Sequence, residues 1–143
     1  QLRTRKPFLL LNGDTFFAVN LNNLLQCHKN CKSDMTLSLI ETRQNKRYSG
    51  VLLDKHGLIC SIDSPTNSSK NGMANGGVYI IESELFSNYQ KQKPKKCSLE
   101  EELLPQLLIK NKRIAGFVSK NSFIDIGIPH DYNLAADILS QHM

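Results

Sequence analysis

The sequence lacks the features that mark several classes of protein. No apolar run approaches the roughly 20 residues of a membrane-spanning helix, and no secretory signal peptide precedes the first apolar segment. Zinc-finger spacing, an aromatic RNA-binding motif and a basic zipper are also absent. We therefore expect a cytoplasmic protein that binds neither a membrane nor nucleic acid.

Cysteine is present, but not in the spacing of a zinc knuckle. The four cysteines are Cys27, Cys31, Cys60 and Cys97, and no C-x-x-C pair occurs among them. Cys27 and Cys31 stand four residues apart, on one face of a predicted helix, but a zinc site would need two more ligands. Free thiols in a reducing compartment are the default expectation, and a metal site at this pair is the less favoured alternative.

Length, composition and charge fit a single globular unit. The 143 residues are 40% hydrophobic and 22% charged, so we expect one domain over residues 1–143. The formal net charge of +5 favours anionic ligands such as phosphorylated small molecules. The basic stretch 91–96 contains Pro94 and no aromatic residue, which is typical of a solvated loop. The first residue is Gln rather than Met, so we expect a processed or shortened chain.

Hydrophobic periodicity predicts alternating strands and helices. The apolar run 8–11 is typical of a strand covered on both faces. Asn20 is a candidate N-cap of the helix that follows, Ser98 and Glu101 form a capping box, and Pro105 should kink or split its helix. We predict strands at 8–11, 34–42, 75–82, 113–119 and 122–126, a hairpin over 50–62 with Gly57 at its turn, and helices at 19–30, 83–89, 98–111 and 129–141. The pattern indicates an α/β fold.

Two predicted strands end in an aspartate, Asp14 and Asp125. For Asp14, the Asn-Gly-Asp sequence can also be only a turn. If the strands meet at one sheet edge, the two carboxylates repel each other, at a cost of about 4 kcal/mol for charges 4 Å apart at an effective dielectric of 20. Such a pair needs a proton or a cation. Hard oxygen ligands without a nearby His or Cys favour Mg²⁺.

Five segments in this order and spacing resemble one protein family. They are FLLLNGDTFF, RYSGVLLDKHGLICSI, NGGVYII, SLEEELLPQLL and FIDIGIPHDY. From about Pro7 to Leu139 the chain is similar to sugar-1-phosphate nucleotidylyltransferases, especially D-glycero-α-D-manno-heptose-1-phosphate guanylyltransferases and the related mannose-1-phosphate guanylyltransferases. The resemblance implies the C-terminal portion of a mixed, mainly parallel sheet flanked by helices, in a Rossmann-like nucleotide-diphospho-sugar transferase fold.

The resemblance also implies an activity and its partners. A nucleoside triphosphate, for this subfamily GTP, reacts with a manno-heptose or mannose 1-phosphate and releases pyrophosphate. The phosphate nucleophile, with a second pKa of about 6, is largely ionised at neutral pH and needs no strong base. The Gly-rich nucleotide loop of the family is absent from this chain. We therefore expect the sugar-phosphate- and metal-binding portion of the domain, inactive alone.

The family motifs assign the candidate site residues. Asp14 and Asp125 match the catalytic, metal-binding pair that holds Mg²⁺. Asn12 and Gly13 precede the first of these, and Glu100 matches a motif residue with no assigned ligand. The Asn75-Gly76-Gly77 segment matches backbone that lies against the sugar. These five residues and the backbone segment are the expected core of the site.

The chain departs from the family around its hairpin. Arg47-Tyr48-Ser49-Gly50 replaces Arg-Tyr-Gly, so Gly50 is the candidate for close approach to the sugar. Asp63-Ser64-Pro65 replaces Glu-Lys-Pro, so Asp63 keeps an acidic group for sugar hydroxyls, whereas the Lys that meets the phosphate is lost. Arg47 could substitute for that Lys, or it is an ordinary surface residue.

Two other functions and one structural consequence follow. A non-catalytic homologue or subunit that binds a sugar phosphate would explain Ser64. A nucleotide-sugar-dependent glycosyltransferase is less favoured, because such enzymes commonly carry Asp-x-Asp and residues 12–14 lack the first Asp.

Without a preceding segment, strand 8–11 should form an exposed sheet edge, or be covered by residues 1–6, a swapped segment or a second copy in a homo-oligomer.

Overall fold

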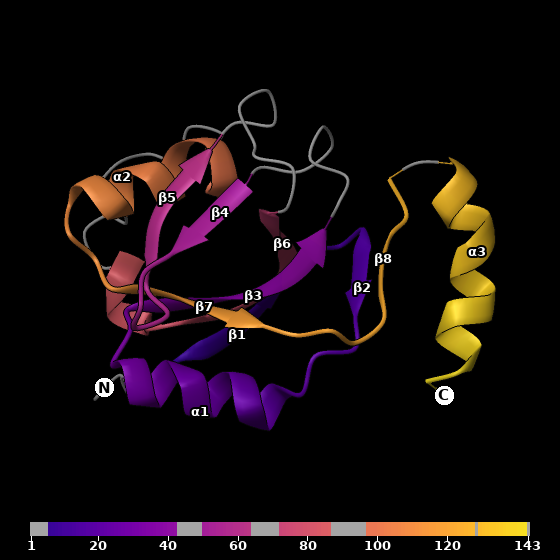
Figure 1. Ribbon diagram of the computed structural model, residues 1–143, viewed down its shortest axis with the longest axis horizontal. Coiled ribbons are helices and arrows are strands. Elements are labelled where there is room, and N and C mark those ends of the chain that lie inside the picture. Colours follow the sequence, from indigo (N-terminus) through magenta and orange to yellow (C-terminus); the bar gives the residue numbers. More distant parts are fainter. Residues whose placement is uncertain (1–5, 43–49, 64–71, 87–96, 128, 143) are drawn as a thin grey trace, which may run out of the picture.

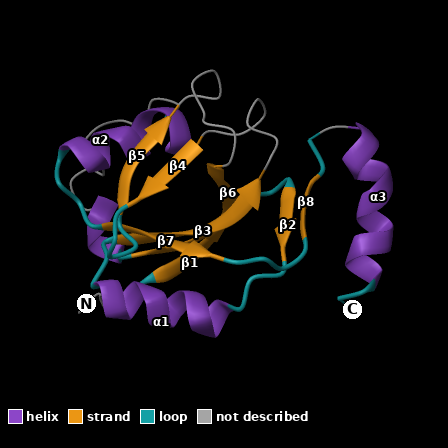
Figure 2. Cartoon of the chain, in the orientation of Figure 1, coloured by secondary structure: helices purple, strands orange, loops and turns teal. Residues whose placement is uncertain are grey.

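The computed structural model describes residues 6–42, 50–63, 72–86, 97–127 and 129–142. Its strands are β1 (Phe8–Leu11), β2 (Thr15–Phe17), β3 (Met35–Thr42), β4 (Gly50–Leu53), β5 (Ile59–Asp63), β6 (Gly72–Ile81), β7 (Ile114–Val118) and β8 (Phe123–Asp125). The helices are α1 (Leu21–Cys31), a 3₁₀ helix (Ser83–Phe86), a π-helix (Leu99–Leu103), α2 (Leu104–Ile109) and α3 (Pro129–Ser140). Figure 2 shows the resulting mixture of helices around sheets, which confirms the α/β fold. No described helix is both long and apolar enough to span a membrane.

The main sheet is built around β6. Its order is β5-β4-β6-β3-β7, and β1 also pairs with β6. β4 joins the beginning of β6, where Val51 pairs with Met73, and β1 joins its end, where Phe8 pairs with Ile81. β2 and β8 form a separate two-stranded sheet, visible beside β6 in Figure 1.

The sheet is mixed, as predicted, but its pairing is mostly antiparallel. In the described part of the chain, β3–β7 is the parallel pair, whereas β6 runs antiparallel to β1, β3 and β4. A short turn joins the antiparallel pair β4–β5, but β6 and its antiparallel partners β1, β3 and β4 are far apart in the sequence. The parallel pair β3–β7 is joined by a long crossover, as such a pair requires, which contains β4, β5, β6, the π-helix and α2.

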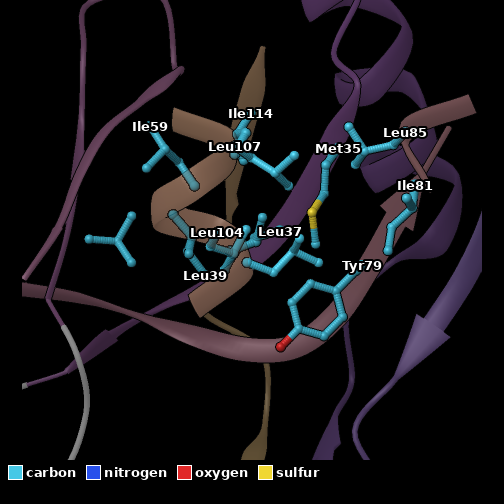
Figure 3. Packing of buried hydrophobic residues seen from close by; sticks show 12 residues of the cluster. Met35, Leu37, Leu39, Ile59, Tyr79, Ile81, Leu85, Leu104, Leu107 and Ile114 are labelled. Atoms are coloured by element: carbon cyan, nitrogen blue, oxygen red, sulfur yellow. The ribbon is translucent and has the colours of Figure 1, made fainter. Parts of the chain in front are cut away.

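Both faces of the central strands are covered. The alternation in β3 sends Met35, Leu37 and Leu39 into one apolar cluster with Leu104 and Leu107 of α2, which Figure 3 shows beside the ring of Tyr79. The other face packs against α1. The second cluster consists of Phe17, Leu24, Ile40, Ala74, Val78 and Ile80. The predicted period-two pattern of β3 is therefore confirmed.

The helix boundaries follow the predicted local signals. The side chain of Asn20 accepts a hydrogen bond from the backbone N–H of Asn23 over 3.0 Å, so it caps α1. Ser98 Oγ accepts from the N–H of Glu101 over 3.2 Å, as in a capping box. The carboxylate that reaches back to the N–H of Ser98 is that of Glu102, because a π-helical turn contains one more residue. Pro105 stands in the first turn of α2 and so marks the predicted split.

β1 is a strand, as predicted, but it is not covered on both faces. Leu9 is 44% exposed and Leu11 is 57% exposed. Among the described residues β1 pairs with β6 alone, so the alternative prediction of an exposed sheet edge is confirmed. An apolar run predicts that a strand will form, but the segments that cover it come from elsewhere in the fold.

Candidate functional site

The pairing of β2 with β8 brings the two predicted metal ligands into neighbouring segments. Thr15 stands opposite Asp125 in the antiparallel register. The N–H of Ile126 donates to the backbone carbonyl of Asp14 over 2.9 Å. The sequence could not establish that these strands are adjacent, and the structure places them side by side (Figure 1).

The two carboxylates differ in their surroundings. Asp14 is exposed, in the bend that precedes β2, whereas Asp125 is half-buried at the end of β8. Asp125 Oδ1 accepts a hydrogen bond from the N–H of Gly127 over 2.8 Å, which orients that carboxylate. The described residues contain no cluster of three or more His, Cys, Asp or Glu that could cage a metal. Two carboxylates with hard oxygen atoms are instead the kind of set that Mg²⁺ uses together with substrate phosphates.

A hydrogen-bonded network joins three other predicted residues, Asn12, Asn75 and Glu100. Asn75 Nδ2 donates to Glu100 Oε1 over 2.6 Å and also to the hydroxyl of Tyr79. The Tyr79 hydroxyl lies 3.3 Å from both Asn12 Oδ1 and Glu100 Oε1. The network therefore connects the loop after β1, strand β6 and the π-helix.

Tyr79 is the member of this network that the sequence analysis missed. Its side chain is fully buried, and burial raises the pKa of its phenol above the ordinary value. The phenol thus remains protonated and can donate a hydrogen bond. One signal could have identified it: Tyr79 carries the polar atom of the otherwise apolar run 78–81, and a buried polar atom needs partners.

The backbone at Gly76 and Gly77 is packed against β2 and the loop before it. A Cβ atom at Gly76 would lie 2.4 Å from Phe17 Cδ1. Gly77 has a φ of +76°, and a Cβ there would lie 2.4 Å from Thr15 Oγ1. These contacts give both glycines a steric reason within the chain itself, beside the sugar contact that the resemblance implies.

The segment between β1 and β2, which carries Asp14, is also tied to Gly77 through its backbone. Asn75 Oδ1 accepts from the N–H of Gly77 over 3.1 Å, and the carbonyl of Gly77 accepts from the N–H of Asn12 over 2.8 Å. Gly13 follows, with nothing within 4 Å of the position that a Cβ would take. Gly13 and Asp14 thus face open space at the end of a well-tethered segment.

Two further predicted residues, Gly50 and Asp63, lie at the open end of the hairpin. Gly50 and Asp63 are Cα partners in the β4–β5 pair, next to the beginning of β6, where Val51 pairs with Met73. Arg47, Tyr48 and Ser64 lie outside the described residues. The structure therefore brings Gly50 and Asp63 together beside the strand that carries Asn75.

Comparisons with known proteins find relatives that match most of this chain. The chain is 33% identical over 140 residues to the D-glycero-alpha-D-manno-heptose 1-phosphate guanylyltransferase of Aneurinibacillus thermoaerophilus, covering 98% of this chain and 59% of that protein. It is 34% identical over 123 residues to the protein of the same name from Campylobacter jejuni, covering 86% and 52%. The crystal structure of HddC from Yersinia pseudotuberculosis complexed with GMP-PN matches with a TM-score of 0.74 and 28% identity, covering 95% of this chain and 56% of that one. The chain thus spans between half and two thirds of the length of these relatives.

The match to a whole family is broader than the match to any one relative. A family model described as nucleotidyl transferase covers residues 1–142, which is nearly the entire chain. The fold, the order of the motifs and the similarity to the relatives above all agree with it, so the resemblance noted from the sequence is confirmed. This chain belongs to the nucleotidyl transferase family.

Proposed function

We propose that this protein serves as a sugar-1-phosphate nucleotidylyltransferase. The reaction joins a nucleoside triphosphate, GTP, to a manno-configured sugar 1-phosphate, either manno-heptose or mannose, and releases pyrophosphate. The observation that carries the proposal is the β2–β8 pairing, which sets the backbone of Asp14 beside that of Asp125. The guanylyltransferase names of two relatives and the GMP-PN complex of a structural neighbour support GTP as the donor.

Asp14 and Asp125 are the residues that would hold Mg²⁺ in this proposal. When bound, Mg²⁺ supplies positive charge that offsets the repulsion between the phosphates of the two substrates. Asp14 reaches open space from a segment tethered to Gly77, and Gly127 orients the carboxylate of Asp125. Because the sugar phosphate is already an anion at neutral pH, the chain needs to orient it and does not need a strong base.

The sugar would lie against the segment that contains Asn75 to Gly77, near the end of the hairpin. The amide of Asn75 donates hydrogen bonds to Glu100 and to the hydroxyl of Tyr79. The orientation of this amide is therefore set before a ligand binds. This is preorganisation, which reduces the entropy lost on binding. The specificity for a manno-configured sugar rests on the relatives rather than on any single contact.

A non-catalytic role in binding a sugar phosphate is the second candidate function. It is favoured by Ser64, which stands where the family carries a Lys for the phosphate. Loss of that positive charge should weaken binding of the sugar phosphate unless Arg47 replaces it. The presence of both Asp14 and Asp125 favours catalysis.

The test is a pyrophosphate-release assay with GTP, Mg²⁺ and either mannose 1-phosphate or the manno-heptose 1-phosphate. It should be run on this 143-residue chain and on the natural protein that contains it. We expect release by the natural protein and none by the isolated chain. Binding of the sugar phosphate without any release by the natural protein would instead establish the second candidate function, and a preference for glucose 1-phosphate would overturn the manno assignment.

A further inference from the structure

Two thiols lie against each other on α1, outside the candidate site. Cys27 and Cys31 stand one helical turn apart on the same face of α1, and both are half-buried. The guanidinium of Arg113 donates to the carbonyl of Cys31 over 2.8 and 3.1 Å, and so ties this end of α1 to the segment that begins β7. The two thiols are therefore neighbours on a helix whose end is fixed by Arg113.

The helix geometry disfavours a direct disulfide between these thiols. Residues four apart on a helix have Cβ atoms roughly 5–6 Å apart, whereas a disulfide requires roughly 3.5–4.5 Å. A single bridging atom relaxes this constraint, because two bonds of about 2.3 Å from one soft atom span the gap between the sulfurs. The pair is thus suited to chelation rather than to oxidation.

The number of nearby ligands determines which metal or metalloid the two cysteines can bind. His28, which lies between the two cysteines in the sequence, is buried and engaged with Thr36 over 2.8 Å and with Glu82 over 3.2 Å. It cannot serve as a third ligand without breaking that network. Zinc prefers four ligands, whereas an organic trivalent arsenical needs two sulfur atoms.

We propose that Cys27 and Cys31 form a dithiol site for a trivalent, thiophilic arsenical. An arsenoxide that carries one organic substituent forms two As–S bonds, one to each sulfur. The two thiol protons leave with the arsenoxide oxygen as one molecule of water, and the oxidation states of arsenic and sulfur do not change. No further reactant is needed.

The other two cysteines provide an internal contrast. Cys60 and Cys97 are exposed, and each thiol donates to a backbone carbonyl nearby, that of Leu58 and that of Ser98 respectively. Each can therefore offer an arsenical one sulfur. Bidentate attachment exceeds monodentate attachment by a factor of roughly 10²–10⁴, which makes retention selective for the pair on α1.

The test uses the 143-residue protein and one equivalent of phenylarsine oxide. Intact mass spectrometry should show one adduct formed with loss of water. The adduct should survive washing with a monothiol and should be removed by a small dithiol. After arsenical treatment, alkylation and peptide mapping should find Cys27 and Cys31 protected and Cys60 and Cys97 labelled.

Serine substitutions test which cysteines retain the arsenical. Cys27→Ser and Cys31→Ser should each weaken retention by roughly a hundredfold or more, whereas the matched changes Cys60→Ser and Cys97→Ser should leave it unchanged. Circular dichroism checks that α1 still forms. Retention that survives loss of either helical cysteine, or an adduct mapped to Cys60 or Cys97, would overturn the proposal. The mapping on the unmodified sequence decides the matter even if a serine variant does not fold.

Discussion

Asn75 and Glu100, from β6 and the π-helix, are joined by a hydrogen bond of 2.6 Å between Nδ2 and Oε1. The same carboxylate oxygen lies 3.3 Å from the hydroxyl of Tyr79. Glu100 therefore holds the amide of Asn75 in place, a role that the sequence motif alone did not assign. This contact connects the fold of the π-helix to the geometry of the candidate sugar site.

Removing that carboxylate should destabilise the protein. Glu100→Ala leaves Asn75 Nδ2 without this acceptor, and we expect the free energy of unfolding in urea to fall by about 1–3 kcal/mol. Glu100→Gln keeps a side-chain oxygen and should recover part of the loss. The control is Glu101→Ala, which changes an exposed neighbour and should stay within about 0.5 kcal/mol. Equal effects at positions 100 and 101 would show that the network contributes nothing to stability.

Alanine substitutions at two glycines of the candidate site should distinguish an effect on stability from an effect on activity. Gly76→Ala places a Cβ 2.4 Å from Phe17 and 2.9 Å from Ser38 Oγ, and we expect a destabilisation of about 1–3 kcal/mol. Gly13→Ala meets nothing within 4 Å and should leave thermal unfolding unchanged. If Gly13 faces the substrate as proposed, the same change lowers the activity of the natural protein. A large loss of stability at Gly13 would contradict the open environment of this residue.

The proposed metal ligand Asp14 can be tested by one charge-removing change. In the natural protein, Asp14→Asn should lower kcat by at least about a hundredfold, the scale for loss of a main electrostatic group. The activity that remains should need more Mg²⁺ for half-saturation. Asp54→Asn, which alters the hairpin turn, is the matched control. An unchanged rate for Asp14→Asn would remove this residue from the mechanism.

The exposed edge at β1 predicts self-association of the isolated chain. Unpaired backbone groups beside exposed leucines are a template for another strand, so light scattering should show a mass that rises with protein concentration. Leu9→Lys or Leu11→Lys should suppress the rise. Ile109→Lys removes a leucine-sized side chain that is 80% exposed on α2 and should not suppress it. A monomeric chain at every concentration would refute the prediction.

Alkaline pH should weaken the folded state through Cys27. Burial, followed by the proximity of Cys31, raises the pKa of the Cys27 thiol from its ordinary value of 9.0 to about 11. A raised pKa means that the folded chain holds this proton more tightly, so the contribution is complete below pH 9 and is lost as the pH rises toward 11. Urea unfolding across this range should therefore show a decline that is smaller in Cys27→Ser. An identical decline in both proteins would exclude the thiol as its source.

The sequence by itself determined the elements whose signals are local. The cap at Asn20, the alternation along Met35–Thr42, the hairpin around Gly57 and the split at Pro105 all appear in the structure. Each depends on residues a few positions apart, and such residues stay neighbours whatever the rest of the chain does. The family motifs likewise named Asp14, Asn75 and Glu100 as candidate site residues.

Only the tertiary structure decided how those parts meet. The pairing of Thr15 with Asp125 joins two three-residue strands, which are too short to show a period in the sequence. The burial of Tyr79 and the exposure of β1 depend equally on which segments pack beside them. Pairing between strands that are distant in the sequence depends on the packing of the whole sheet, and no local sequence pattern predicts it. For this reason the sequence named the residues of the candidate site, whereas the fold determined their neighbours.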